Sequence, residues 1–177
     1  MAELKDQNLK HYIENYVNLR NVTLCYLFDK KADRVLLAMK KRGFGAGKLN
    51  GVGGKVEKAE SIEDALLRET REEINVNLKK FEKVAVINFY FKNNPIEKDF
   101  NQKAHVFIAY EWEGEPAESE EMAPQWVNTK GLPFENMWSD DIYWLPNILS
   151  GKKLIASFLF DNENNIVDMD IKEVKSF

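Results

Sequence analysis

The sequence predicts a mixed α/β fold in which a mixed β-sheet is flanked by helices. Short apolar or alternating runs recur between turn signals along most of the chain, which indicates strands. Two further segments, 62–74 and 141–150, are predicted to be helical. With 177 residues, 44% of them hydrophobic, the chain can bury one substantial core and is close to the usual size of one domain.

The chain begins with a polar segment and a predicted β-hairpin. Residues 1–20 carry only sparse apolar positions, so we expect a short helix or a loosely docked extension to a domain that spans residues 21–177. Residues 21–28 and 34–40 run apolar or alternate on either side of the turn signals at 29–33. That arrangement is typical of a hairpin.

A glycine-rich loop follows the hairpin. Residues 43–48 end in Gly-Lys, as a nucleotide-binding P-loop does, but the spacing is one residue short and Leu49 stands where that loop needs Ser or Thr. We therefore expect a flexible lip over a ligand pocket, with Phe44 and Asn50 pointing into it. The pair Asn50-Gly51 is itself typical of a tight turn.

The helix predicted at 62–74 has signals at both ends. Ser61 and Asp64 form a capping-box pattern, which starts the helix at Ile62. Asn75 ends it, because Asn is second only to Gly in tolerating the left-handed conformation that closes a helix.

The remaining elements follow in the order of strands, helix and hairpin. The turn Asn93-Asn94-Pro95 separates the first two of these strands, and Pro146 should bend or shorten the helix predicted at 141–150. The remaining strands share apolar runs bounded by turn residues and are 84–91, 104–112, 124–127, 153–160 and 165–171.

The helix at 62–74 carries three acids on the side where an apolar stripe would continue. Ile62 and Leu66 share one face at roughly 100° per residue. One heptad later the same face carries Glu69, Glu72 and Glu73, which we call the acid row. Carboxylates that face inward repel one another and are costly to desolvate unless a cation compensates them. An all-oxygen cluster suits Mg²⁺ or Mn²⁺.

A plainer interpretation is that the acid row is a solvated charged face paired with Arg68 and Arg71, as exposed charge runs often are. Its position on the apolar side favours a metal site. So does the glycine turn at 51–54, where backbone can approach a ligand or metal closely.

The spacing of these residues resembles the signature of the Nudix hydrolase family. Thr70 stands where the family usually has an aliphatic residue, and Asn75 where it usually has glycine. The resemblance implies an α/β/α sandwich with a mixed sheet. The matching positions are Gly54, Glu60, Arg68, Glu69, Glu72, Glu73 and Val76.

Beyond this signature, the segments 34–47, 50–56 and 137–146 resemble the MutT-type branch, whose members hydrolyse oxidised purine nucleoside triphosphates such as 8-oxo-dGTP. Leu49 departs from that branch, which has Trp there. The resemblance implies a base pocket lined by Asn50, Trp138, Asp140 and Asp141, with weaker matches at Thr23, Phe89 and Phe91.

These pocket residues have chemically sensible roles. Stacking a purine on Trp138 would contribute roughly 1–3 kcal/mol. Asp140 and Asp141 need not both ionise when close together, so one can donate and one accept at a purine edge, which would admit 8-oxoguanine and oxidised adenine. The structural alternatives are that Trp138 is core and that Asp140 or Ser139 caps the following helix.

The implied reaction is hydrolysis at the β-phosphorus, which releases a nucleoside monophosphate and pyrophosphate. The acid row and the Gly53 carbonyl would hold Mg²⁺, which lowers the pKa of an attacking water. Glu121 matches a family acid that binds metal or accepts the proton, or is simply a loop charge. Lys40 and Lys55 would reach phosphate oxygens, and Arg68 would be structural.

Two other functions remain open. One is a Nudix hydrolase for another diphosphate linkage, in a dinucleotide, a nucleotide sugar or a capped RNA end. The other is a catalytically silent ligand-binding module, which the intact acid row argues against.

The composition of the chain indicates which partners and which compartment to expect. The net charge of −4, from 29 acids and 25 bases, argues against binding long nucleic acid. The single cysteine, Cys25, lies in an apolar run and suits a reducing compartment. No apolar run reaches membrane-spanning length and no secretory pattern is present. We therefore expect a cytoplasmic monomer that acts on a small nucleotide.

Overall fold

The structure is a computed structural model that describes residues 8–92 and 100–177. Its helices are α1 (Leu9–Asn15), α2 (Ile62–Ile74) and α3 (Asp141–Leu149), with two 3₁₀ turns at Thr129–Gly131 and Phe134–Asn136. Its strands are β1 (Arg20–Asp29), β2 (Arg34–Lys40), β3 (Leu49–Asn50), β4 (Asn77–Phe91), β5 (Gln102–Glu113), β6 (Met122–Asn128), β7 (Lys153–Phe160) and β8 (Ile166–Val174).

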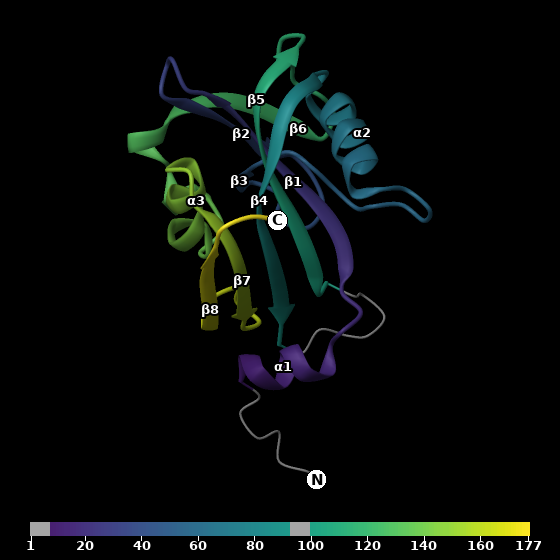
Figure 1. Ribbon diagram of the computed structural model, residues 1–177, viewed down its shortest axis with the longest axis vertical. Helices are drawn as coiled ribbons and strands as arrows, with labels where there is room; N and C mark the ends of the chain where they lie inside the picture. The colour runs from purple at the N-terminus through teal and green to yellow at the C-terminus, as the bar shows by residue number, and fades with distance from the viewer. Residues whose placement is uncertain (1–7, 93–99) are drawn as a thin grey trace.

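The strands form one mixed sheet with helices on both sides (Figure 1). The order is β3-β2-β1-β5-β4-β7-β8, and β6 pairs with β2. The pairs β1–β5 and β4–β7 are parallel, while the other strand pairs are antiparallel. The predicted mixed α/β sandwich is confirmed.

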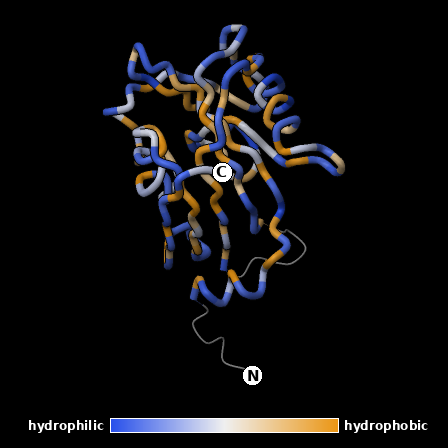
Figure 2. Tube along the Cα trace, viewed as in Figure 1, coloured by the Kyte–Doolittle hydropathy of each residue, from blue (hydrophilic) through white to orange (hydrophobic). Residues whose placement is uncertain are grey.

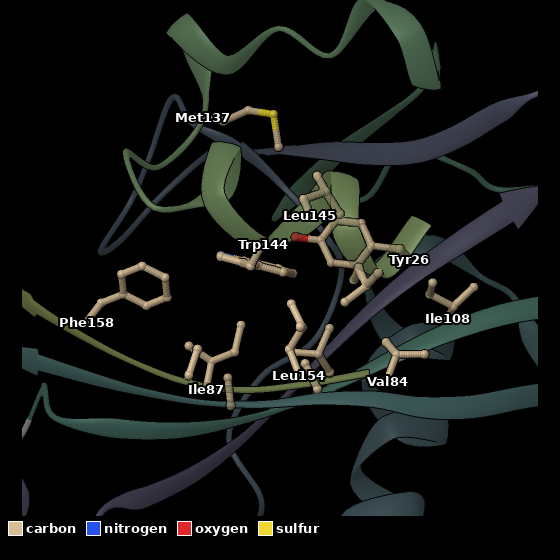
Figure 3. Close-up of a cluster of buried hydrophobic side chains, with 14 of the residues drawn as sticks. Tyr26, Val84, Ile87, Ile108, Met137, Trp144, Leu145, Leu154 and Phe158 are labelled. Carbon is tan, nitrogen blue, oxygen red and sulfur yellow. The ribbon is translucent and has the colours of Figure 1, made fainter. Parts of the chain in front are cut away.

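Alternation along the central strands builds a separate core on each face of the sheet. On β1, Tyr26 packs in the cluster that contains Trp144 and Leu145 of α3, whereas Leu27 packs in the cluster that contains Leu66 of α2. Figure 3 shows the first cluster, with the α3 side chains lying over the strands. In Figure 2 the apolar colour runs along the central strands, as expected for strands covered on both faces.

The predicted first hairpin is confirmed only near its turn, where Phe28 pairs with Val35. Beyond that point β1 continues in parallel beside β5, and β2 continues beside β6. The segment after β3 occupies the free side of β1, through bridges from Cys25 to Val52 and from Val22 to Lys55. This divergence places the glycine turn beside β1 and directly before α2.

The predicted tight turn at Asn50-Gly51 is wrong, because Asn50 belongs to β3 and Gly51 lacks the positive φ that such a turn requires. Gly51 is needed for close approach instead, since a Cβ there would lie 2.7 Å from the Cys25 carbonyl oxygen. The Asn50 side chain is also engaged: its Oδ1 accepts hydrogen bonds from the Tyr26 hydroxyl (2.7 Å) and the Gly51 N–H (2.8 Å).

Other predicted elements are present with different bounds. β4 starts at Asn77 rather than at residue 84, because its first half is an exposed, bulged strand in which only Leu78 is buried. The predicted turn at 93–95 lies outside the described residues. The helix expected within 1–20 is present as α1, which buries Leu9 and Tyr12 against Tyr90 and Leu159.

No helix in the described part of the chain is both long enough and apolar enough to cross a membrane.

Candidate functional site

Helix α2 presents two of the three acids of the row, Glu69 and Glu73, to the glycine turn. Both of its predicted end signals are confirmed: Ser61 Oγ accepts a hydrogen bond from the Asp64 N–H (3.0 Å), and Asn75 is left-handed at φ 58° and ψ 39°. Thr70 is fully buried and its hydroxyl donates to the Leu66 carbonyl (2.6 Å), so this departure from the family pattern fits the core.

Two members of the acid row touch the glycine turn directly. Glu73 is only 7% exposed, and its Oε2 accepts a hydrogen bond from the Gly53 N–H (2.8 Å). Glu69 packs so closely on Gly54 that a Cβ at that position would lie 2.5 Å from Glu69 Oε1. Glu72, the third member, is exposed. Gly53 is required for a different contact, since at φ 150° a Cβ there would overlap the Thr23 carbonyl oxygen of β1.

Burial governs the electrostatics of the two inward acids of the row. Burial raises the pKa of Glu73 to about 7, although the Gly53 N–H and the charge of Lys40 act in the opposite direction. Burial also raises the pKa of Glu69, against a hydrogen bond from Arg68. The charge of Glu121 adds a smaller contribution to both shifts, so Glu121 lies close enough to act on the row. Such a site favours a bound cation.

The donor set fits a divalent metal, since every side chain is a carboxylate and the two nearest to the turn are desolvated. Across residues 8–92 and 100–177, however, no three His, Cys, Asp or Glu side chains stand close enough to hold an ion together. Arg68 explains part of this, because its guanidinium binds Glu69 (2.8 Å) and Glu72 (3.3 Å).

Arg68 also anchors the start of the helix, as expected for a structural residue. It donates two hydrogen bonds to Glu60, at 2.8 and 3.0 Å, and one to the Lys55 carbonyl (3.1 Å). The Arg68 bonds are the main reason that the pKa of Glu60 falls to about 2. Arg68 thereby fixes the Lys55 backbone relative to Glu69 and Glu72.

Glu121 stands at the other rim of the site. Its side chain is 51% exposed and its Oε1 accepts a hydrogen bond from Arg42 Nη2 (2.6 Å). The backbone of the same loop pairs with β2, since Lys41 N–H donates to the Glu121 carbonyl (2.8 Å). The contacts are compatible with a role at the metal and with a loop charge.

Next to the acid row lies a cavity of about 350 Å³. It gathers every substrate-binding residue predicted from the sequence, and Gly53 and Gly54 form the boundary that it shares with the acid row. The predicted residues in its lining are Thr23, Lys40, Phe44, Asn50, Lys55, Phe89, Phe91, Trp138, Asp140 and Asp141.

An aromatic wall closes one side of this cavity. Phe44, on the glycine-rich loop, stacks on Phe100 with ring centroids 4.9 Å apart and lies 5.2 Å from Trp138. Gly45 packs under Trp138, where a Cβ would come within 3.0 Å of the indole. Trp138 is partly exposed, so it is a wall residue, while Trp144 is the tryptophan of the core.

Asp140 and Asp141 form a buried acid pair, 2% and 1% exposed. Asp140 accepts a hydrogen bond from Trp144 Nε1 (2.8 Å), and Asp141 accepts one from the Trp138 N–H (3.1 Å). Burial raises the pKa of Asp140 to about 6. Burial and then the charge of Asp140 raise the pKa of Asp141. The Asp140 side chain makes no capping bond to α3, so capping does not account for it.

The sequence did not single out several other lining residues. Lys48 lies at the end of the glycine-rich loop, where its Nζ is 5.5 Å from the Trp138 ring centre and its charge lowers the pKa of Asp141. Arg20 and Gln102 begin β1 and β5. Only strand register shows that they share the cavity face. Leu49, where the resembling branch has Trp, is buried in the core instead.

The chain was compared with known proteins. The model of the NUDIX domain family matches residues 18–148. The oxidized purine nucleoside triphosphate hydrolase of Mus musculus is 45% identical over 144 residues, which cover 81% of this chain and 90% of that protein. Its Danio rerio counterpart is 46% identical over 142 residues, which cover 80% and 88%. The crystal structure of a MutT protein from Bacillus halodurans superposes with a TM-score of 0.75 at 26% identity, covering 87% of this chain and 98% of the other.

Proposed function

This chain belongs to the NUDIX family, and from that premise we propose that it hydrolyses oxidised purine nucleoside triphosphates to the monophosphate and pyrophosphate. The mouse and zebrafish relatives are named as hydrolases of oxidized purine nucleoside triphosphates. One observation supports it most: Gly53 and Gly54 line the cavity that contains Trp138 and the buried acid pair, and they also contact two acids of α2. A nucleotide would thus bind with its base in the cavity and its phosphates beside the acids, on the two sides of this short turn.

Nudix hydrolases use a divalent metal, and we propose Mg²⁺, with Mn²⁺ as a substitute. The ligands would be Glu69, Glu72 and Glu73 with the Gly53 carbonyl and Glu121. When bound, the metal would neutralise the triphosphate and activate the attacking water.

The side chains of the chain itself would bind and orient the substrate. Lys40 and Lys55 line the cavity near the glycine turn and would reach phosphate oxygens. Glu121 would accept the proton of the attacking water or bind metal. Trp138 would stack on the purine, and Asp140 and Asp141 would meet a base edge as one neutral and one ionised group.

A substrate panel tests the proposal. Pyrophosphate release is measured for 8-oxo-dGTP, 2-hydroxy-dATP and dGTP, with a dinucleotide, a nucleotide sugar and a capped RNA as competitors. We expect 8-oxo-dGTP to be preferred over dGTP. Preference for another diphosphate linkage would assign the chain a different Nudix activity, and no hydrolysis at all would make it a binding module.

The base pocket has its own test within this assay. Trp138→Ala should lower kcat/KM for 8-oxo-dGTP by about tenfold, because one base-stacking contact is lost. Trp126→Ala is the matched control, since Trp126 stacks on Trp112 away from the cavity. An unchanged preference for 8-oxo-dGTP in Trp138→Ala and Asp140→Asn would show that the pocket is wrongly placed.

We also expect a monomer in the cytoplasm. Size-exclusion chromatography with light scattering and fractionation of cells would test these two points.

A further inference from the structure

One polar side chain in the cavity lining, that of Gln102, has no role in the proposed reaction. Gln102 opens β5, paired on one side with Arg20 of β1 and on the other with Phe89 of β4. Cross-strand partners project to the same face of a sheet, so Gln102 lies between two other lining residues. It is partly buried rather than free in solvent.

The Gln102 amide makes no side-chain hydrogen bond to any described residue, although it borders an aromatic wall that includes Phe44, Phe89 and Phe91. The neighbouring amide of Asn101 differs, since it is buried and its Oδ1 accepts a hydrogen bond from the Phe91 N–H (2.9 Å). An amide without a protein partner in a largely apolar wall is available to a ligand.

Gln102 and the acid pair lie at different ends of the cavity. Tyr26, whose pKa is raised by burial and by the charges of Asp141 and Asp140, is bonded to Asn50, whereas Gln102 pairs with Arg20, at the other end of β1. A base whose six-membered ring meets Asp140 and Asp141 would therefore turn its five-membered ring toward Gln102.

The five-membered ring is where oxidation changes a purine. In an 8-oxopurine, C8 carries a carbonyl oxygen that accepts, and N7 carries a hydrogen that donates. In an undamaged purine N7 accepts and C8 carries only a C–H group. A carboxamide presents one donor and one acceptor side by side, the complement of the oxidised edge.

We propose that Gln102 is a specificity-determining residue that hydrogen-bonds the N7–H and C8=O groups of an oxidised purine base. The inference rests on the proposed function and deepens it. The acid pair would hold the base, and the Gln102 amide would detect the oxidation itself.

The test measures kcat/KM for two substrates with the oxidised five-membered ring, 8-oxo-dGTP and 8-oxo-dATP, and two without it, dGTP and 2-hydroxy-dATP. Gln102→Met keeps the length of the side chain and removes both hydrogen-bonding groups; Gln102→Glu removes the donor and adds a negative charge. We expect each variant to lose about tenfold for the two 8-oxo substrates, as for a lost bidentate contact, and little for the other two. Lys103→Met is the control, because Lys103 is the next residue on β5 and faces the other side of the sheet.

A second readout is independent of turnover. Calorimetric affinity for 8-oxo-dGMP over dGMP, without added metal, should fall in Gln102→Met and not in Lys103→Met, and thermal melting checks that each variant is folded. If wild-type protein hydrolyses no oxidised purine triphosphate, the proposed function itself fails. If it does, but Gln102→Met affects all four substrates alike or none of them, the role of Gln102 is overturned.

Discussion

At the scale of single residues, the site depends on carboxylates that are kept from water. Glu73, Asp140 and Asp141 are all less than a tenth exposed, and burial is the main cause of the raised pKa of each. Raised pKa values of this kind are common where acids bind cations or share protons with a ligand. The chain retains them at a cost in stability, which is measurable.

Asp140 provides the pH test of that cost. Its pKa is raised to about 6 in the folded protein from about 3.8 when unfolded. At pH 3 and below both states hold the proton, so the group has almost no effect. Between pH 4 and pH 6 the unfolded state loses its proton first, so stability falls as pH rises, and the penalty then stays constant.

Asp140→Asn should therefore be more stable than wild type at pH 7, by about 1–3 kcal/mol, and nearly equal to it at pH 3. The Asn Oδ1 can still accept the hydrogen bond from Trp144. Urea unfolding at the two pH values measures the difference. A variant that is equally or less stable at pH 7 would show that the carboxyl is not destabilising.

At the scale of elements, α2 was the easiest to predict. Its capping residues and length are local in sequence, and the helix bounds match the structure. Of the three acids predicted to face inward, Glu69 and Glu73 do so, while Glu72 is exposed and paired with Arg68. β3 was missed because Asn50-Gly51 is a turn pair in isolation, whereas in the structure Asn50 pairs with Ala38 of β2 and its side chain is bonded to the Tyr26 hydroxyl. The full length of β4 was missed because its bulges break the alternation.

The left-handed end of α2 allows a pair of opposite substitutions. Asn75→Gly should stabilise the protein slightly, and Asn75→Ala should destabilise it by about 1 kcal/mol, since Ala tolerates positive φ poorly. Thermal unfolding in the absence of metal gives both values. The same sign for both substitutions would contradict the assigned cap.

Helix α1 supports the cavity from behind. Tyr12 packs against Tyr90 and Leu159, whose neighbours Phe91 and Phe160 line the cavity on the other face of the sheet. Tyr12→Ala should cost about 2–4 kcal/mol of stability, in the range of aromatic truncations in a core. Tyr16→Ala is the control because Tyr16 is 40% exposed and should cost much less. Equal losses would mean that α1 is not docked as described.

At the scale of the whole molecule, the sequence predicted which residues would form the site better than it predicted how they meet. Each predicted substrate residue lines one cavity, since the motifs that indicated them specify side chains. Arg20 and Gln102 could not be predicted, because their place on the cavity face depends on the parallel register of β1 and β5. Register between distant strands leaves no local pattern to find.

The proposed function requires that the acids of α2 act through a divalent metal on a nucleotide held in the neighbouring cavity. The most direct measurement is the Mg²⁺ dependence of 8-oxo-dGTP hydrolysis by wild-type protein and by Glu73→Gln. Glu73→Gln keeps an oxygen for the Gly53 N–H and removes one charge. We expect wild-type activity to vanish with EDTA and return with Mg²⁺, and the variant to be at least 100-fold slower at any Mg²⁺ concentration, roughly the loss when the residues around a catalytic metal are altered. Hydrolysis by Glu73→Gln at the wild-type rate, or activity that persists without metal, would contradict the central claim.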